Sequence, residues 1–232
     1  TLQRIAGLQQ VRYVEANREL EWHNGDAQIT TNAGTVQDRF DLGYTGDGVH
    51  VAVIDSGIDA YHPDLQNRLK HNYQYVDPLS VSGSAMWQDV GVADTDDIGH
   101  GTHCSGSIVG EGNQNAEYEG MAPDADLTVY AAGAGLSILA AVGAYDHLLQ
   151  NHTRSEFEAG NIPEDEVVHL TSNSYGATGG ADFNPVGASE LATWEAFNAG
   201  ITVVGSAGNS GPGENTLGAA KTAPYILCVA AS

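Results

Sequence analysis

The sequence predicts an α/β protein built on a mostly parallel, twisted sheet with helices on both faces. Between residues 49 and 231, short apolar runs rich in Val, Ile and Ala alternate with helix-length segments, which is typical of parallel sheets. The runs are too apolar to have one face in water, so we expect them to be central strands. These runs are Val49–Ile54, Leu127–Ala131, Val167–Thr171, Ile201–Ser206 and Ile226–Ala230.

Two helices and two long loops complete this outline. We expect a helix after Ser137, whose hydroxyl is available as the N-cap, and another from about Ala188 to Asn198 that stops at Gly200. The first helix has one apolar stripe, formed by Ile138, Leu139, Val142, Tyr145, Leu148 and Leu149. The hydrophilic stretches Asp77–Gly99 and Glu111–Gly120 predict long loops, which are either functional or simple surface insertions.

Composition excludes several classes of partner. The 30 acidic residues exceed the 8 basic ones and give a formal charge of −22, which repels phosphate backbones, so we expect no nucleic-acid partner. No uninterrupted apolar run approaches the roughly 20 residues of a membrane-spanning helix, so we expect no membrane span. Because salt screens self-repulsion, the charge would suit a saline environment, which is a hypothesis. Cys104 and Cys228 fit neither a zinc spacing nor a disulfide framework.

The first candidate for chemistry is a carboxylate at the end of an apolar strand. Residues 51–59 read VAVIDSGID. Ligand sites in parallel α/β sheets lie at the carboxyl ends of strands, so Asp55 is well placed. An Asp at a strand end is also a common turn former, and the motif alone leaves both interpretations open.

The second candidate is a histidine flanked by small residues. Residues 99–106 read GHGTHCSG, and a histidine at the start of a helix acts as a general base when a buried carboxylate holds its other ring nitrogen. Asp55 is the candidate for that carboxylate. A zinc site formed by His100, His103 and Cys104 is disfavoured, because a metalloprotease helix places its second histidine at i+4 and a Glu after the first.

Two further motifs follow apolar strands. Residues 203–211 read VVGSAGNSG, and an amide held at this strand end, Asn209, is suited to donate a hydrogen bond to an oxyanion; a simple turn is the alternative. Ser174, Tyr175 and Gly176 follow the strand at 167–171. An exposed extended edge there would pair with a peptide by strand addition.

Taken together and in this order, the motifs resemble those of the subtilisin-like serine proteases, the subtilase family. The segments that carry the resemblance are VAVIDSGIDAYHPDL, GHGTHCSGSIVG and GSAGNSGPG, and the resemblance runs from about Thr45 to Ser232. The order of Asp before His is also the subtilisin order. The resemblance implies a subtilisin-like fold and a serine endopeptidase that hydrolyses polypeptide substrates through an Asp-His-Ser triad.

The resemblance also implies a role for individual residues. Asp55 is similar to the triad aspartate, His100 to the triad base and Asn209 to the oxyanion-hole amide. His103 would then be structural and packed on the helix. The segment Ser174, Tyr175 and Gly176 matches the backbone that pairs with substrate, although a tyrosine stands where an apolar residue is commoner.

Three more residues are singled out near these motifs. Cys104 resembles the free cysteine beneath the catalytic histidine in some branches of the family. Asp96 and Asp97, just before the histidine motif, would favour basic side chains next to the scissile bond, or they belong to a solvated loop.

A structural calcium ion is the implied cofactor, and no organic cofactor is expected. Asp64 follows His62-Pro63 as in family members where this carboxylate binds calcium, and the loop around Asn113 would supply further oxygens. Calcium takes six to eight oxygen ligands, of which the sequence identifies two candidates. An acid at a helix N-terminus is the alternative for Asp64.

The Gly-Thr-Ser-Met-Ala type of motif that carries a subtilase nucleophile does not occur in the 232 residues. We therefore expect residues 26–232 to be the N-terminal two thirds of a catalytic domain, truncated on its C-terminal side, and inactive alone. The serine would lie on a second chain or a C-terminal segment. The alternatives are a truncated sequence and a noncatalytic peptide-binding or inhibitory scaffold, with an acidic calcium-dependent structural protein as a third class.

The start of the chain differs from the rest. Residues 1–25 are expected to be either the end of an inhibitory propeptide or an N-terminal arm. The polar stretch Trp22–Asp47 is expected to be a linker or a wrapping arm. Proteases that resemble this sequence are usually secreted, so an extracellular location is expected.

Overall fold

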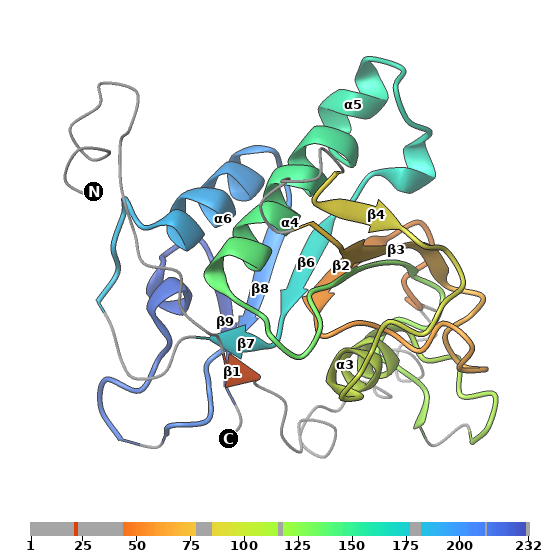
Figure 1. Ribbon diagram of the computed structural model, residues 1–232, viewed down its shortest axis with the longest axis horizontal. Coiled ribbons are helices and arrows are strands. Elements are labelled where there is room, and N and C mark those ends of the chain that lie inside the picture. Colours follow the sequence, from red (N-terminus) through yellow and green to blue (C-terminus); the bar gives the residue numbers. More distant parts are fainter. Residues whose placement is uncertain are drawn as a thin grey trace.

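The computed structural model describes residues 21–22, 44–77, 85–115, 118–176, 182–211 and 213–230. Its described residues form a seven-stranded sheet in the order β4-β3-β5-β2-β6-β8-β9 (Figure 1). All neighbouring strands run parallel except β3 and β4. The strands are β2 (His50–Asp55), β3 (Leu69–Tyr75), β4 (Trp87–Asp89), β5 (Asp126–Ala131), β6 (Leu170–Asn173), β8 (Thr202–Ser206) and β9 (Leu227–Val229).

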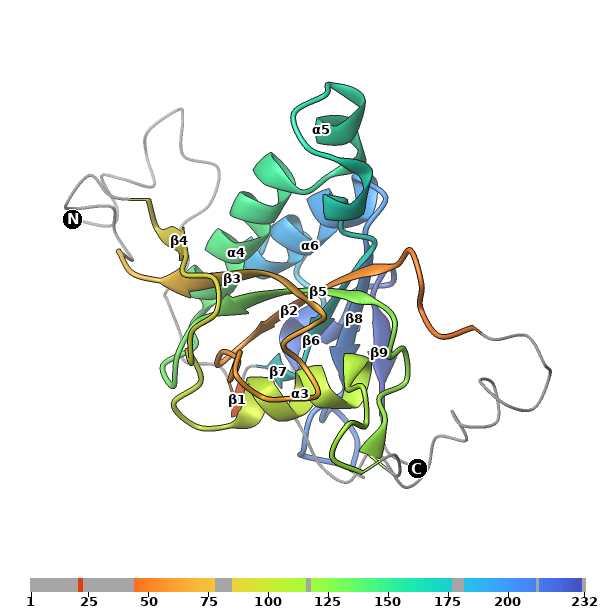
Figure 2. The same cartoon turned by 90° about the vertical axis from the view of Figure 1, so that its right-hand side faces the viewer.

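Helices cover both faces of this sheet, as expected. Figure 2 shows α4 (Ile138–Asn151) and α6 (Ala188–Asn198) on one face and α3 (His100–Val109) on the other. Alternate residues of β2 enter two separate cores: Ala52 and Ile54 pack beneath α4 and α6, whereas Val51 and Val53 pack on the side of α3. A strand that is buried on both faces is apolar along its whole length. This explains why the apolar run alone predicts β2. The predicted α/β class is confirmed.

Short elements complete the described chain. They are α5 (Arg154–Glu158), the 3-10 helices η3 (Glu164–Glu166) and η4 (Ala219–Thr222), and a two-stranded antiparallel pair of β1 (Glu21–Trp22) with β7 (Tyr175–Gly176). None of the described helices combines the length and the apolar character needed to cross a bilayer. The expectations for residues 1–25 and for the linker at 22–47 fall almost wholly outside the described residues.

The helix predictions are largely confirmed. Ser137 Oγ accepts a hydrogen bond from the backbone N–H of Ala140 at 3.4 Å, so it caps α4 as expected. Helix α6 has the predicted bounds, and Gly200 beyond it has a φ of +86°, which favours glycine. The buried stripe of α4 differs from the predicted one, because small side chains allow a close approach to the sheet. It consists of Ala140, Ala141, Ala144, Tyr145 and Leu148, while the other predicted members are only partly buried.

The edges of the sheet differ from expectation. β9 is an outer strand of the described sheet, with Leu227 59% and Val229 57% exposed, so the prediction of a central strand is wrong there. The apolar composition of a segment indicates that burial is favourable. It does not identify the segment that would cover it. β3 and β4 were not predicted. β3 reads LKHNYQY, with few apolar positions, and β4 lies inside the stretch 77–99 that was expected to be a loop.

Candidate active site

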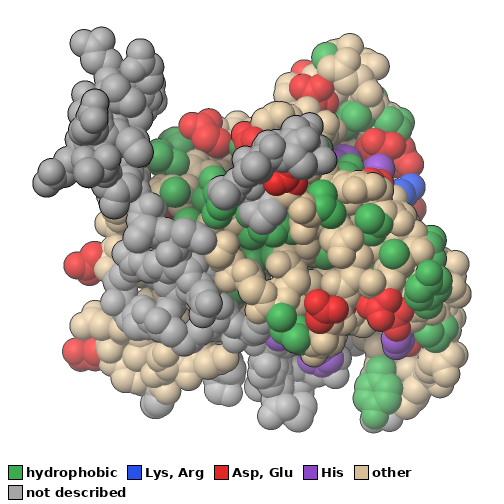
Figure 3. Space-filling view, in the orientation of Figure 1, with side chains coloured by type: hydrophobic (Ala, Val, Ile, Leu, Met, Phe, Trp, Pro, Cys, Tyr) green, Lys and Arg blue, Asp and Glu red, His purple; other side chains and the backbone are tan. Residues whose placement is uncertain are grey.

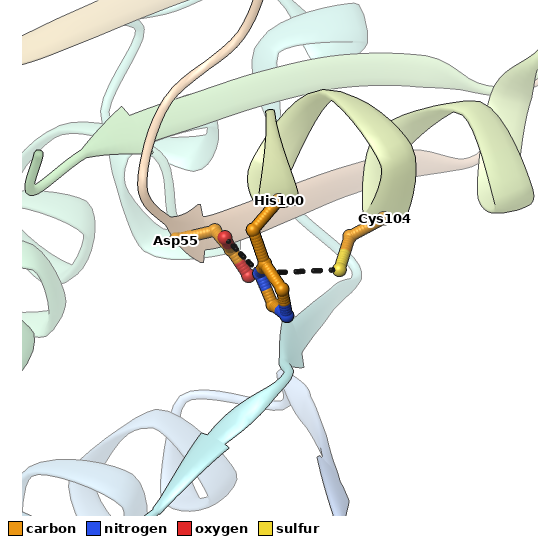
Figure 4. Close-up of side chains that lie close together, drawn as sticks. All are labelled: Asp55, His100 and Cys104. Atoms are coloured by element: carbon orange, nitrogen blue, oxygen red, sulfur yellow. Dashed lines mark hydrogen bonds and ion pairs between the residues drawn. The ribbon is translucent and has the colours of Figure 1, made fainter. Parts of the chain in front are cut away.

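Asp55 and His100 are in direct contact. Asp55 is the last residue of β2 and fully buried, and His100 is the first residue of α3. His100 Nδ1 lies 2.6 Å from Asp55 Oδ1 (Figure 4). Because a carboxylate only accepts, this contact places the proton on Nδ1 and leaves Nε2 as the basic nitrogen. Asp55 and His100 therefore have the geometry that a general base and its orienting carboxylate require.

The backbone brings these two residues together through glycines. Gly57 has a φ of +146°, and a Cβ on it would meet Thr95 O at 2.2 Å. A Cβ on Gly101 would meet Gly57 O at 2.2 Å, so the first turn of α3 lies directly on the turn that follows β2. Only glycine permits this approach, which explains the small residues around His100 in the sequence.

A polar network that was not predicted locks the start of α3. Asp96 accepts hydrogen bonds from the Ser56 hydroxyl at 2.6 Å and from the Thr102 hydroxyl and N–H at 2.6 and 2.8 Å. Ser56 Oγ in turn accepts from Gly101 N at 2.8 Å. Burial alone would raise the pKa of Asp96, but the hydrogen bonds from Ser56 and Thr102 lower it below its ordinary value. Asp96 thus holds the first turn of α3 against the turn that follows β2.

Cys104 lies next to the pair, one turn along α3. Its Sγ is 3.8 Å from His100 Nδ1, and the residue is buried (Figure 4). Burial and the charge of Asp55 raise the pKa of this thiol, although a hydrogen bond with Ser174 acts in the opposite direction. The side chain therefore remains a neutral thiol and supports the imidazole by contact.

The expected substrate edge is covered by the chain itself. Tyr175 and Gly176 form β7 and are buried, and their backbone pairs antiparallel with Trp22 and Glu21 of β1. Ser174 lies between β6 and β7 and interacts with Cys104. The segment is thus extended and able to pair with a peptide, but the expectation of an exposed edge is wrong, since residues of the same chain pair with it.

Asn209 lies at the same edge of the sheet as Asp55. It is exposed and follows β8 by three residues, and β2, β6 and β8 are adjacent and parallel. The carboxyl ends of these strands therefore carry Asp55, Ser174 and Asn209 in order.

Asp64 and Asn113 meet in one loop cluster. Asp64 Oδ1 accepts from Gln114 N at 3.2 Å, and its carbonyl accepts from Glu111 N at 3.0 Å. Asn113 donates its side-chain amide to Pro63 O at 3.0 Å. The loop after α3 is therefore folded onto the Asp64 turn, which the sequence places 49 residues earlier.

Lys221 is a buried residue that the sequence analysis missed. Its Nζ donates to Asn173 O at 3.3 Å and lies 4.9 Å from the centre of the Tyr175 ring. Burial lowers its pKa to about 8. A single lysine in a polar stretch carries no sequence signal of burial, because only the packing of η4 against β7 and β9 encloses it.

Among the described residues, His103 does not join His100 and Cys104 in a cluster of potential metal ligands, and it is exposed. Asp55, His100 and Cys104 instead bring their ligand atoms within 4.8 Å of one another. Since Asp55 engages His100 Nδ1 directly, the hydrogen bond accounts for this cluster without an ion.

Comparison with known proteins agrees with this geometry. Residues 46–232 match the sequence model of the subtilase family. The chain is 31% identical over 198 residues to the minor extracellular protease Vpr of Bacillus subtilis, covering 84% of this chain and 22% of that protein. It is 30% identical over 226 residues to the serine protease AprX of the same species, covering 95% and 46%.

Solved structures agree as well. A psychrophilic protease, S41, superposes with a TM-score of 0.59 at 25% identity, covering 85% of this chain and 58% of that one. Sphericase, at 23% identity and the same TM-score of 0.59, covers 89% and 61% and shares the fold. The chain spans less than half the length of the two curated relatives named above. Because the matching family model covers most of the chain, the protein belongs to the subtilase family.

Proposed function

We propose that this chain forms the acid–base half of a serine endopeptidase that cleaves polypeptides. The observation that carries the proposal is the 2.6 Å contact between His100 Nδ1 and Asp55 Oδ1 in a chain of the subtilase family. His100 Nε2 would take the proton of a serine hydroxyl and later pass it to the leaving amine. Asp55 would stabilise the imidazolium, and Asn209 would bind the oxyanion.

The attacking serine is proposed to lie outside residues 1–232. The sequence contains no Gly-Thr-Ser-Met-Ala type of motif, and Ser56, beside the pair, is occupied by Asp96 and Gly101. Alone, the chain should show no proteolysis, because removal of the nucleophile in subtilisin costs about 2 × 10⁶ in turnover.

A serine-directed fluorophosphonate tests this proposal. Applied to the full natural protein, it should label one serine outside residues 1–232, and His100→Ala should prevent the labelling. Intact mass spectrometry would reveal whether that serine is on a second chain. If the natural protein, with Asp55 and His100 intact, neither reacts with the fluorophosphonate nor hydrolyses peptides, the noncatalytic scaffold is the better conclusion.

That noncatalytic alternative has its own support in β7. An edge that accepts β1 as a neighbouring strand can bind other extended peptides without cleaving them. A scaffold would retain peptide binding after His100→Ala, as a protease would, so turnover rather than binding separates the two functions.

We further propose that residues 1–25 are the end of an inhibitory propeptide. The pairing of Glu21 and Trp22 with β7 supports this, because it occupies backbone that substrate would need. N-terminal sequencing of the naturally produced protein is the test. A mature start near Thr30 supports a propeptide, and a start at or before Thr1 supports a permanent arm. Secretion is proposed by analogy with relatives such as the minor extracellular protease Vpr.

A calcium ion is proposed at Asp64 and Asn113. The chemistry of the donors fits, because a buried carboxylate and a carboxamide lie in one loop cluster, and calcium prefers such oxygens. Bound calcium would tie the loop after α3 to the Asp64 turn. Calcium should raise the melting temperature of the natural protein, and Asp64→Asn should remove most of that rise. An equal rise in the variant would rule out this site.

A further inference from the structure

We propose that a zinc-type divalent cation binds at a second site, with His71, His152 and Glu166 as its ligands. His71 lies on β3, His152 directly follows α4, and Glu166 ends η3. The three ligand atoms lie within 4.8 Å of one another. Histidine and acidic side chains are seen together on the surface below α5 (Figure 3).

This site is separate from the catalytic pair. His71 pairs with Thr128 of β5, and Thr128 pairs with Ala52 of β2, so His71 lies two strands away from β2 and level with Ala52. Asp55 lies three residues further along β2, about 10 Å at 3.3 Å per residue, and two strand spacings of about 4.8 Å add to this separation. A metal bound here would not touch the reacting groups.

The strongest observation is a ring nitrogen that faces a carboxylate without a hydrogen bond. Among the described residues, buried His71 Nε2 has no hydrogen-bond partner. Glu166 Oε2 is its near neighbour at 3.7 Å, beyond hydrogen-bond length. With the proton of this ring on Nδ1, Nε2 and the carboxylate both present lone pairs to the same space. A cation between them would satisfy both.

Outer partners hold both imidazoles in the orientation of metal ligands. His71 Nδ1 lies 2.8 Å from Asp89 Oδ2, and His152 Nδ1 lies 3.2 Å from the carbonyl oxygen of Glu166. Both acceptors favour a proton on Nδ1, which leaves Nε2 of each ring for a metal. Ligating histidines characteristically donate their other N–H to a carboxylate or carbonyl in this way.

The electrostatics suit zinc. Asp89 and Glu166 supply negative charge in a chain whose formal charge is −22. Two imidazoles and a carboxylate are an established zinc donor set that leaves the fourth position for water.

One local bond must change when the ion binds. His152 Nε2 accepts a hydrogen bond from the Tyr73 hydroxyl at 2.8 Å, so zinc competes with this hydroxyl. Tyr73→Phe keeps the ring and removes the competitor. The variant should therefore bind zinc more tightly than the wild type.

Such an ion would join β3, the end of α4 and the turn before β6, three elements far apart in sequence. Its binding should be read out as stability rather than activity, because a ligand that binds only the folded state raises its melting temperature. We expect zinc chloride to bind the metal-stripped natural protein, returned to calcium buffer, at one equivalent by titration calorimetry and to raise the melting temperature.

Glu166→Gln is the decisive variant, because it keeps the shape of a half-exposed side chain and removes the anionic ligand. It should weaken zinc binding by at least the roughly 10- to 100-fold that loss of an outer partner costs. Glu164→Gln is the matched control. Glu164 lies on the same turn but pairs with Arg154 at 2.9 Å, so zinc affinity should not change.

Cobalt distinguishes this site from the cluster at Cys104. Co²⁺ bound by His71, His152 and Glu166 has no sulfur ligand and gives no thiolate charge-transfer band. Such a band would instead indicate binding at Asp55, His100 and Cys104 and would overturn the proposal. So would an absence of zinc binding, equal affinity of Glu166→Gln and wild type, or no gain in affinity for Tyr73→Phe. In those cases a protonated His71 bridging Asp89 and Glu166 is the better description.

Discussion

His100 Nδ1 lies 2.6 Å from Asp55 Oδ1 although 45 residues separate the two in the sequence. The contact joins the end of a central strand to the first residue of a helix on the opposite side of a glycine turn. A hydrogen bond this short to a carboxylate is charge-assisted, and it becomes stronger when the imidazole takes up a second proton. The pair is therefore suited to stabilise an imidazolium for a short time.

Asp55→Asn in the complete enzyme should lower kcat on the order of 10⁴-fold, with little change in KM. The carboxamide favours the tautomer with the proton on Nε2, so His100 would no longer accept a proton there. Steady-state kinetics on a peptide substrate measures the effect. Asp146→Asn, at an exposed position of α4, is the control and should retain activity.

Gly101→Ala should abolish activity and destabilise the fold. The new Cβ would lie 2.2 Å from Gly57 O and 3.1 Å from Asp55 Oδ1, so α3 would have to move away from the strand end. Gly106→Ala on the same helix meets nothing within 4 Å and should be neutral or stabilise by about 0.5–1 kcal/mol. Melting temperature and activity of the two variants give the comparison, and equal effects would contradict the close contact.

Lys221 should make stability rise with pH between about 8 and 10.5. Its folded pKa of about 8 is below its ordinary value of 10.5, so the unfolded state binds more protons in this window. Burial of the charged Lys221 side chain lowers the free energy of unfolding by about 3 kcal/mol below pH 8, and this penalty disappears towards pH 10.5. Denaturant unfolding of Lys221→Met at several pH values should lack this rise.

Lys70→Met provides the contrasting control for that measurement. A hydrogen bond to Asp165 raises the pKa of Lys70 above its ordinary value. The stabilisation of the folded state by Lys70 is therefore present below the pKa of the unfolded state. It is lost as the pH rises through the pKa of the folded state, which is the reverse of the effect of Lys221.

The two cysteines should differ in reactivity. Burial and the Asp55 charge raise the pKa of Cys104, whereas Cys228 is exposed. Iodoacetamide near pH 8 should therefore alkylate Cys228 first and reach Cys104 only after denaturation. In a Cys228→Ser background of the complete enzyme, a mercurial that labels Cys104 should displace His100 and stop turnover. Full activity after complete labelling would contradict the contact.

Ser137→Ala should lower the free energy of unfolding by about 1 kcal/mol, because the N–H of Ala140 loses its cap. Ser137→Asp restores an acceptor and should recover most of the loss. Chemical denaturation measures both, and equal stability of all three proteins would show that the cap contributes nothing.

The sequence predicted correctly those parts of the molecule whose structure depends on the residues of one segment alone. β2 is buried on both faces, so apolar composition alone identifies it, and glycines beside Asp55 and His100 mark backbones that approach closely. β3 was missed because polar residues such as His71 and Asn72 fill it, and their partners come from β4 and the following loop.

The polar contacts escaped prediction for a related reason. Asp96 and Lys221 have no local pattern of their own, and their environments arise only when distant segments pack. The exposed edge expected at Ser174 to Gly176 was wrong because strand pairing is a property of two segments, and the sequence of one does not identify the other. The catalytic roles of Asp55, His100 and Asn209 remain predictions for the kinetic experiments to decide.

The close contact between Gly57 and Gly101, which positions α3, has a consequence for how the sequence of this protein can vary. The position of His100 is set by main-chain atoms of residues 57 and 101, so it does not depend on the side chains at the surface. The charge of the surface, strongly acidic in this chain, could therefore change while His100 and Asp55 keep their places. Surface side chains therefore determine how the protein meets its solvent, whereas main-chain atoms determine the geometry of the Asp55–His100 pair.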